Sequence, residues 1–361
     1  MSDERKIVYI VTHGEEDPEI ATIPFILANS AMAMDVTPVI ILQSNGVMLG
    51  VKGYADKVHF KEGISLKGHE DILRYEEILR IVEQAVKIGF IKVRLTGGEP
   101  LVRSNFAEFA RSLKQIDGLR DISLTTNGLL LEQYAQDIFH AGIRRINVSL
   151  DSMNKDKYFY ITGGGKLEDV LRGIDIADTV GFAPIKINAV VVRGFNDDEL
   201  LAFAELALRK PYQVRFIEIM PISDVNWNQP TAFLPTVQIY ETISKKYKLE
   251  ALGQKKNKTD GPARIYKMKD GAGEIGFINP VSDHFCSTCN RLRLTADGKL
   301  RVCLLNEMEV DLKEALNRKC SDDELAELIR RAILLKPQKH DLDCTDRHLK
   351  KCHRDMSDIG G

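Results

Sequence analysis

The sequence predicts an α/β fold in which parallel strands form a barrel or partial barrel covered by helices. Between residues 75 and 219, short apolar segments alternate without interruption with amphipathic helical segments, and this alternation is typical of a parallel sheet built from βαβ units. Polar and glycine residues gather where the predicted strands end, which is where such folds place their sites. Five strand–helix units in sequence favour a barrel or partial barrel over an open sheet.

The boundaries of these units follow from apolar runs for the strands and from apolar stripes for the helices. The predicted strands are residues 91–96, 121–125, 144–150, 185–193 and 214–219. The predicted helices are residues 75–89, 131–141, 167–180 and 197–208, with a further helix after Ser104, which is expected to cap it.

Residues 1–60 predict a βαβ segment of a different character. Strands at residues 6–12 and 38–42 flank an apolar helix at residues 19–34, and a short helix is expected over residues 46–54. The run Val-Thr-His-Gly-Glu-Glu-Asp-Pro resembles the start of DsrE-like sulfur-relay domains. Where such domains are catalytic they use a cysteine, and this segment has none, so we interpret His13 as a loop residue.

The cysteines indicate a metal site in the C-terminal quarter, because all six lie after residue 285. Cys286, Cys289 and Cys303 have the spacing C-x2-C-x13-C, and Asp297-Gly298 predicts a hairpin turn that returns Cys303 to the first pair. Three thiolates favour a four-iron cluster with one iron open to a small molecule. A zinc ribbon with His284 as fourth ligand is the alternative.

The rest of the C-terminal part is less regular, with helices expected at residues 236–247 and 322–334. Arg291 and Arg293 share one face of the strand after Cys289, because side chains alternate along a strand. Two guanidinium groups therefore lie beside the predicted metal site. The last residues, 336–361, hold two more cysteines that lack metal-ligand spacing.

Composition excludes several classes of function. The chain of 361 residues has a net charge of −2, which gives no global basic field for nucleic acid. No run approaches 18 apolar residues, and Asp3 and Glu4 do not fit a signal peptide, so we expect a cytoplasmic protein without a membrane partner.

Several motifs together resemble one family over about residues 62–361. The motifs are Arg94-Leu95-Thr96-Gly97-Gly98-Glu99-Pro100-Leu101, Leu124-Thr125-Thr126-Asn127-Gly128, Arg145-Ile146-Asn147-Val148-Ser149-Leu150-Asp151, Arg215-Phe216-Ile217-Glu218, the cysteine hairpin and the terminal Gly360-Gly361. This combination resembles molybdenum cofactor biosynthesis protein A, the radical S-adenosylmethionine GTP 3′,8-cyclase family. The resemblance implies a partial TIM-type barrel of the radical S-adenosylmethionine kind over residues 61–221 and a C-terminal cofactor-synthesis module over residues 222–361.

The resemblance also implies site residues, position by position. The residues implied for S-adenosylmethionine are Gly97, Gly98, Glu99, Pro100, Ser149 and Met220. Those implied for GTP are Arg94, Thr125, Lys186, Arg291 and Arg293. The cysteines implied for one four-iron cluster are Cys286, Cys289 and Cys303. No side chain is assigned as catalytic, since the family's 5′-deoxyadenosyl radical takes the ribose 3′ hydrogen of GTP before C3′ attacks C8.

The departure from the family lies at the N-terminus. The family begins with a strand and a C-x3-C-x2-C loop for the cluster that cleaves S-adenosylmethionine, and residues 1–60 contain no cysteine. An N-terminal arginine that the family uses on GTP is also missing. We therefore expect the chain to keep GTP binding and to lack radical initiation, with the strands at residues 6–12 and 38–42 filling the place of the first barrel strand. The alternative is a non-catalytic GTP-binding or sulfur-relay interaction protein, and a second copy of the chain is a candidate partner.

Overall fold

The computed structural model describes residues 72–220, 230–252 and 261–340, and four short strands before them. The chain divides into two compact units, Met1–Leu73 and Arg74–Gly361. The strands of the first unit are β1 (Lys6–Val11), β2 (Thr37–Leu42), β3 (His59–Phe60) and β4 (Ile64–Ser65).

Strand β1 pairs in parallel with β2, as the predicted βαβ segment requires, and β3 pairs with β4 antiparallel. The predicted helices at residues 19–34 and 46–54, and His13, lie outside the described residues. The expectation that the first two strands complete the barrel is wrong: they form a two-stranded sheet of their own. The two strands can pair with each other as well as with a larger sheet, and the apolar pattern does not show which sheet a strand joins.

The second unit is built on one eight-stranded sheet with the order β10-β11-β12-β9-β8-β7-β6-β5. Strands β5 to β9 and β12 run parallel to one another, whereas β11 pairs antiparallel with both β12 and β10. Their bounds are β5 (Lys92–Leu95), β6 (Asp121–Thr126), β7 (Arg145–Ser149), β8 (Ile185–Val191), β9 (Gln213–Glu218), β10 (Leu249–Ala251), β11 (Arg264–Met268) and β12 (Glu274–Ile278).

This arrangement confirms the predicted α/β class with a parallel sheet, and it is consistent with a partial barrel of the TIM type, since the end strands β5 and β10 do not pair with one another. The sheet also crosses the predicted boundary at residues 221 and 222, because β12 pairs with β9. The three strands β10 to β12 were not predicted, since residues 222–285 carry weak periodicity.

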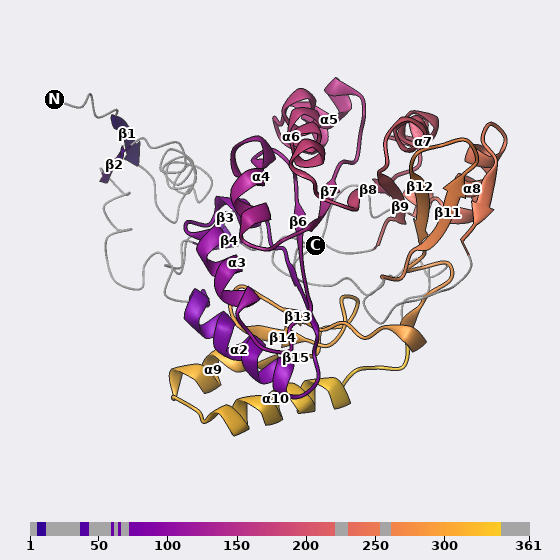
Figure 1. Cartoon of the computed structure of the whole chain (residues 1–361). Helices are drawn as coiled ribbons and strands as arrows, with labels where there is room; N and C mark the ends of the chain where they lie inside the picture. Colours follow the sequence, from indigo (N-terminus) through magenta and orange to yellow (C-terminus); the bar gives the residue numbers. More distant parts are fainter. Residues whose placement is uncertain are drawn as a thin grey trace. The chain divides into compact units, whose positions relative to one another are not determined.

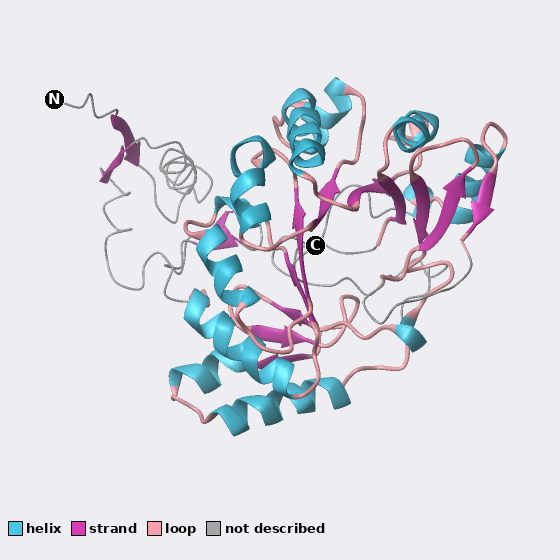
Figure 2. Ribbon diagram, in the orientation of Figure 1, coloured by secondary structure: helices cyan, strands magenta, loops and turns pink. Residues whose placement is uncertain are grey.

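Helices cover the outer side of the parallel strands, as Figures 1 and 2 show. Each helix packs against the next in the series α2, α3, α4 and α6, and α7 packs against α8. Their bounds are α2 (Tyr75–Lys87), α3 (Phe106–Lys114), α4 (Leu131–His140), α6 (Leu167–Val180), α7 (Leu200–Arg209) and α8 (Thr236–Ser244). A short helix, α5 (Lys155–Ile161), was missed. The predicted Ser104 cap is wrong, because the N-cap of α3 is Asn105 in a left-handed conformation.

The parallel strands present two unlike faces. Residues that alternate along them, such as Leu124, Ile146, Ile187 and Val214, are fully buried under the helices and form the core. The residues between them are polar or charged in β5 to β9, except Val190 and Ile217 near the ends of β8 and β9. Because side chains alternate across a strand, one face of the sheet is apolar and the other is a continuous polar surface.

A second, three-stranded sheet carries the predicted cysteine hairpin. Its strands are β13 (Arg293–Leu294), β14 (Lys299–Arg301) and β15 (Glu309–Asp311), followed by α9 (Leu312–Asn317) and α10 (Asp322–Leu334). The antiparallel register Arg293↔Arg301 confirms the predicted hairpin, and Gly298 takes a φ of 82° in its turn. Helix α10 packs against α2, which joins this module to the edge of the helix layer.

Candidate functional site

The loops at the carboxyl ends of the parallel strands are held by carboxylates that lie on the loops or strand ends themselves. In the loop after β5, one oxygen of Glu99 accepts hydrogen bonds from the amide of Leu101 (3.0 Å) and the hydroxyl of Thr126 (2.9 Å). The other oxygen accepts from the amide of Asn127 at 2.7 Å. Burial raises the pKa of Glu99, although these three donors act against it. Glu99 thus ties the loop after β5 to the loop after β6.

The predicted Gly97-Gly98 pair lies in the same loop with its backbone open. A Cβ added at either glycine would meet no described protein atom within 4 Å, so packing against the protein does not require a glycine here. Gly97 has a φ of 155° and Pro100 opens the short 3-10 helix that follows. A ligand can therefore approach the backbone carbonyls and amides of this turn directly.

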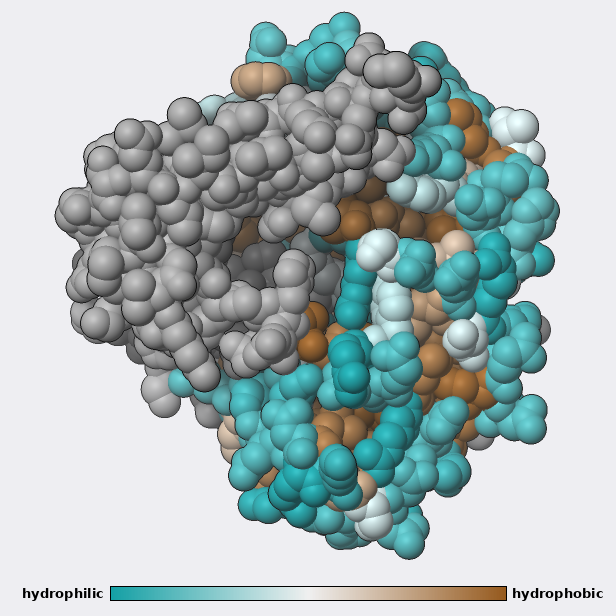
Figure 3. Space-filling view, turned by 90° about the vertical axis from the view of Figure 1, so that its left-hand side faces the viewer, coloured by the Kyte–Doolittle hydropathy of each residue, from teal (hydrophilic) through white to brown (hydrophobic). Residues whose placement is uncertain are grey.

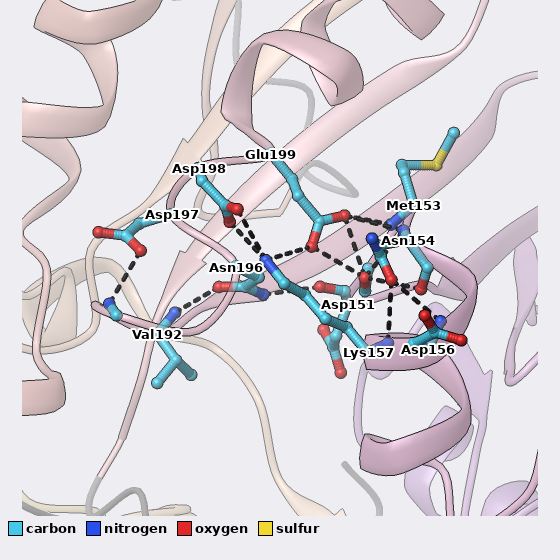
Figure 4. A network of polar contacts seen from close by, with 12 residues as sticks. Asp151, Met153, Asn154, Asp156, Lys157, Val192, Asn196, Asp197, Asp198 and Glu199 are labelled. Carbon is cyan, nitrogen blue, oxygen red and sulfur yellow. Dashed lines mark hydrogen bonds and ion pairs between the residues drawn. The ribbon is translucent and has the colours of Figure 1, made fainter.

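A polar network joins the loops after β7 and β8, and Figure 4 shows it from close by. The Asn196 amide group donates to the carbonyls of Asp151 (2.6 Å) and Val190 (2.8 Å). The carboxylate of Glu199 accepts from the hydroxyl of Ser152 and from two backbone amides on the same loop. Burial raises the pKa of Asp151 to about 6. The predicted Ser149 ends β7 just before this network and is exposed.

Glu218 performs the corresponding task at the end of β9. Its side chain is fully buried, and its carboxylate accepts hydrogen bonds from the amides of Thr236 (3.1 Å), Val281 (3.2 Å) and Ser282 (3.0 Å) and from the Ser282 hydroxyl. Glu218 therefore fixes the N-terminus of α8 and the segment that leads from β12 to Cys286. The predicted Met220 follows two residues after Glu218 and is half-buried.

The polar face of the sheet carries a concentration of positive charge. Adjacent strands pair Asn147 with Lys186 and Asn188 with Arg215, so basic side chains recur on this one face. The basic residues of this face, which we call the cationic face, are Lys92, Arg94, Arg145, Lys186 and Arg215. Asp121 pairs with Lys92 at 3.0 Å and with Arg145. The sum is a net positive surface that fits a polyanionic ligand.

Mutual repulsion shows that these charges lie close together. The pKa of Lys186 is lowered to about 7 by burial and by the charges of Arg215, Arg145, Lys92 and Arg94. Burial is also the main cause that lowers the pKa of Arg94, followed by the charge of Arg291. Arg94 is an exposed residue of β5, and the charge of Arg291 acts on its guanidinium, so Arg94 lies on the side of the cationic face toward the cysteine hairpin.

Two buried polar atoms on this face have no hydrogen-bond partner, namely the Ser123 hydroxyl and the Asn188 side-chain oxygen. Buried polar atoms are normally satisfied, so these two are available to a ligand or to water. The predicted Thr125 lies on the same face, is buried, and has its hydroxyl oxygen 3.2 Å from the Asn147 amide nitrogen.

The cysteine hairpin lies next to this face. The first pair of cysteines spans a 3-10 turn in which the amide of Cys289 donates to the carbonyl of Cys286 at 3.1 Å. Burial lowers the pKa of Arg293 to about 10, and Arg293 interacts electrostatically with Arg291, both Cys289 and Cys303, and Arg94. Burial raises the pKa of the Cys289 thiol, but the charge and hydrogen bonds of Arg291 outweigh this and leave it lowered.

The donor chemistry fits an iron–sulfur cluster. Cys286, Cys289 and Cys303 are free thiols, all half-buried, and guanidinium groups beside them stabilise thiolates. Within residues 72–220, 230–252 and 261–340, however, no group of three or more His, Cys, Asp or Glu side chains is close enough to hold a single metal ion. The fold thus brings the predicted ligands to one corner without gathering them around one ion.

Two family models match the chain. The Radical SAM superfamily model matches residues 50–207, and the Molybdenum Cofactor Synthesis C model matches residues 212–342. A protein of Moorella thermoacetica named GTP 3′,8-cyclase is 48% identical over 299 residues, which are 83% of this chain and 90% of that protein. Proteins of the same name from Alkaliphilus oremlandii and Thermodesulfovibrio yellowstonii are 44% and 46% identical, with 83% of this chain and 91% of each protein covered.

The chain belongs to the GTP 3′,8-cyclase family. Its function lies in molybdenum cofactor biosynthesis, and the predicted resemblance is confirmed. Among solved structures, one titled as TYW1 with a lysine–pyruvate adduct bound is 20% identical, with a TM-score of 0.36 over 48% of this chain and 63% of that one. Streptococcus suis SuiB bound to S-adenosylmethionine is 14% identical, with a TM-score of 0.39 over 48% and 39%. Such scores indicate only partial likeness.

For this member of the family, the structure brings together the predicted Arg94, Lys186, Arg291 and Arg293 through the cationic face and the hairpin. The predicted Gly97, Gly98, Pro100, Ser149 and Met220 lie on loops or strand ends at the carboxyl rim. Sequence reasoning missed the basic residues Lys92, Arg145 and Arg215. Their alternation with apolar residues in strands that were themselves predicted could have revealed them.

The cluster that the family uses to cleave S-adenosylmethionine does not fit this chain. No cysteine occurs in residues 1–285, so the thiolates that a C-x3-C-x2-C loop would supply are absent from the first strand units. Among the cysteines that the structure describes, Cys286, Cys289 and Cys303 belong to the hairpin and Cys320 is buried, so none of these is placed to supply them. In the part of the chain that the structure describes, no helix is long and apolar enough to span a membrane. On the face that Figure 3 shows, hydrophilic residues of the described part surround apolar patches.

Proposed function

We propose that this chain binds GTP with its triphosphate on the cationic face and its base toward the cysteine hairpin. The observation that carries the proposal is the convergence of Lys186 and Arg94 from the sheet with Arg291 and Arg293 from the hairpin. A triphosphate relieves the repulsion among these cations, and guanidinium groups bind its oxygens in a bidentate way. The unpartnered Ser123 and Asn188 atoms add neutral hydrogen-bonding groups.

We further propose that the three hairpin cysteines hold one four-iron cluster, which when bound supplies an open iron for the guanine base. The open turn at Gly97-Gly98 would receive the amino-acid end of S-adenosylmethionine through its backbone, since both Glu99 oxygens already accept protein donors. The chain keeps these binding elements and lacks the thiolates for radical initiation. By itself we propose it to be a GTP-binding, cytoplasmic protein of the molybdenum cofactor pathway, and its free cysteines support this location.

GTP binding is tested by replacing a guanidinium between the two parts of the site. Arg293→Ala is expected to weaken GTP binding by roughly tenfold to a hundredfold, the usual effect of losing one charge-assisted contact. Anaerobic calorimetric titration measures this directly, and Arg291→Ala should behave in the same way. Arg120→Ala is the control, because Arg120 is exposed just before β6, at the amino end of the sheet. Unchanged affinity in both hairpin variants would refute this placement of GTP.

Lys186 predicts a specific dependence of GTP affinity on pH. With a pKa of about 7 in the free protein, Lys186 is mostly neutral above that pH, and a bound triphosphate favours its charged form. Binding must then include proton uptake, so the dissociation constant for GTP should rise roughly tenfold from pH 7 to 8.5. Lys186→Met should bind GTP more weakly at pH 6.5 and show a flatter profile. The two proteins having parallel profiles would contradict this role, because ionisation of GTP itself affects both equally.

A further inference from the structure

Lys336 follows α10 and bridges the two limbs of the cysteine hairpin. Its ammonium group donates to the carbonyl of Arg291 at 2.9 Å and to the carbonyl of Val302 at 2.8 Å. Arg291 lies two residues after Cys289, and Val302 immediately precedes Cys303. A single side chain therefore fixes the separation of the two segments that carry the first cysteine pair and the third cysteine.

Residues 336–340, which we call the C-terminal strap, also contact the segment that leads into the hairpin. The buried ring of His340 has its Nε2 atom 2.9 Å from the carbonyl of Pro280, to which it donates, and it lies edge-on to the ring of His284. Pro280 immediately precedes Val281 and Ser282, whose backbone amides donate to the carboxylate of Glu218 at the end of β9. The strap thus contacts two backbone carbonyls of the hairpin and one of the segment that leads to it, none of which belongs to a cysteine.

We infer that Lys336 is a positioning residue for the three-cysteine site: it sets the spacing of the thiolates and holds a positive charge beside them. This inference rests on the proposed four-iron cluster. An ammonium group suits both tasks, since it has three donors and no acceptor, and two of its donors are used by the carbonyls. Its charge acts on the nearby Cys289 thiol together with that of Arg291. A cluster held by thiolates is anionic. A fixed cation beside it opposes protonation of the thiolates and therefore slows the release of iron to a chelator.

A lysine two residues after a helix ordinarily predicts a solvated side chain that complements the helix dipole. Lys339, farther along the same strap, has an exposed side chain. Lys336 differs because its side chain is half-buried and its ammonium group donates hydrogen bonds to two backbone carbonyls. The two lysines therefore form a matched pair for an experiment. Replacing either one removes one positive charge, but only the replacement of Lys336 removes the hydrogen bonds to the carbonyls of Arg291 and Val302.

The test reconstitutes the full chain anaerobically with iron and sulfide and follows release of the cluster to an iron chelator by visible absorbance. Lys336→Met should release iron at least tenfold faster than the unaltered chain, and Lys339→Met should match the unaltered chain. Lys336→Arg, which keeps charge and donors, should recover most of the slow release. Thermal unfolding of the metal-free chains is measured in parallel, and Lys336→Gln replaces the Met variant if the latter does not fold.

The outcomes separate this inference from the proposed cluster. Stoichiometric zinc without charge-transfer absorption in the unaltered chain, or full iron content in Cys289→Ser, would overturn the cluster itself. A normal cluster in the unaltered chain with equal release rates in the Lys336→Met and Lys339→Met variants would overturn only the role of Lys336. Faster release in Lys336→Met with an unchanged unfolding midpoint supports the role and excludes general loss of the fold.

Discussion

Replacing residues 1–60 with a first barrel strand that carries a C-x3-C-x2-C loop is expected to create 5′-deoxyadenosine formation in a chain that otherwise forms none. The unaltered chain has no cysteine before Cys286. Its three hairpin cysteines lie near Arg293 and hold the other cluster in our proposal, so they do not replace the missing thiolates. The replacement has a place to pair, because β5 ends the described sheet and has only β6 as its neighbour there. The Gly97-Gly98 turn and the cationic face would then serve a complete site.

The measurement is the amount of 5′-deoxyadenosine produced with S-adenosylmethionine, dithionite and GTP under anaerobic conditions. The expected difference is between no detectable product and many turnovers. The matched control carries the same new segment with its three cysteines changed to serine, which preserves the strand and removes the thiolates. Product from the unaltered chain would contradict the prediction, and so would equal activity of the serine control.

Glu218→Ala is expected to destabilise the second unit by about 4 kcal/mol or more. The substitution leaves three backbone amides without their acceptor, the buried amide of Thr236 and the part-buried amides of Val281 and Ser282. It also opens a cavity at a side chain that is fully buried. The segment leading to Cys286 would lose its attachment to β9, so cluster retention should fall together with stability.

Chemical unfolding followed by circular dichroism measures this effect. Glu83→Ala is the control, because Glu83 is exposed on α2 and its removal should change the free energy of unfolding by no more than about 0.5 kcal/mol. A Glu218→Ala loss as small as that of the control would show that water or a shifted loop satisfies the three amides. Glu218→Gln should lie between the two, since the amide keeps one acceptor oxygen and places a donor against the other N–H groups.

The sequence by itself determined the elements whose periodicity is strong and whose environment is uniform. Helices α6 and α10 were predicted with their observed bounds, Leu167–Val180 and Asp322–Leu334, because a long apolar stripe between clear boundary signals leaves no other solution. The parallel strands β5 to β9 were predicted to within a few residues for the same reason. The cysteine spacing and Asp297-Gly298 determined the hairpin, since the turn needs a residue that accepts positive φ at Gly298.

Only the tertiary structure decided which charges meet. Lys92, Arg145 and Arg215 lie far apart in the sequence and become neighbours of Lys186 through strand register, which no local pattern records. The partners of Glu218 and Lys336 come from segments 18 to 64 and 34 to 45 residues away, respectively. The sheet joined by β1 and β2 was decided in the same way, because an apolar strand can satisfy its hydrogen bonds in either sheet. Local patterns specify what a segment forms, whereas pairing and burial of polar groups depend on the chain's three-dimensional path.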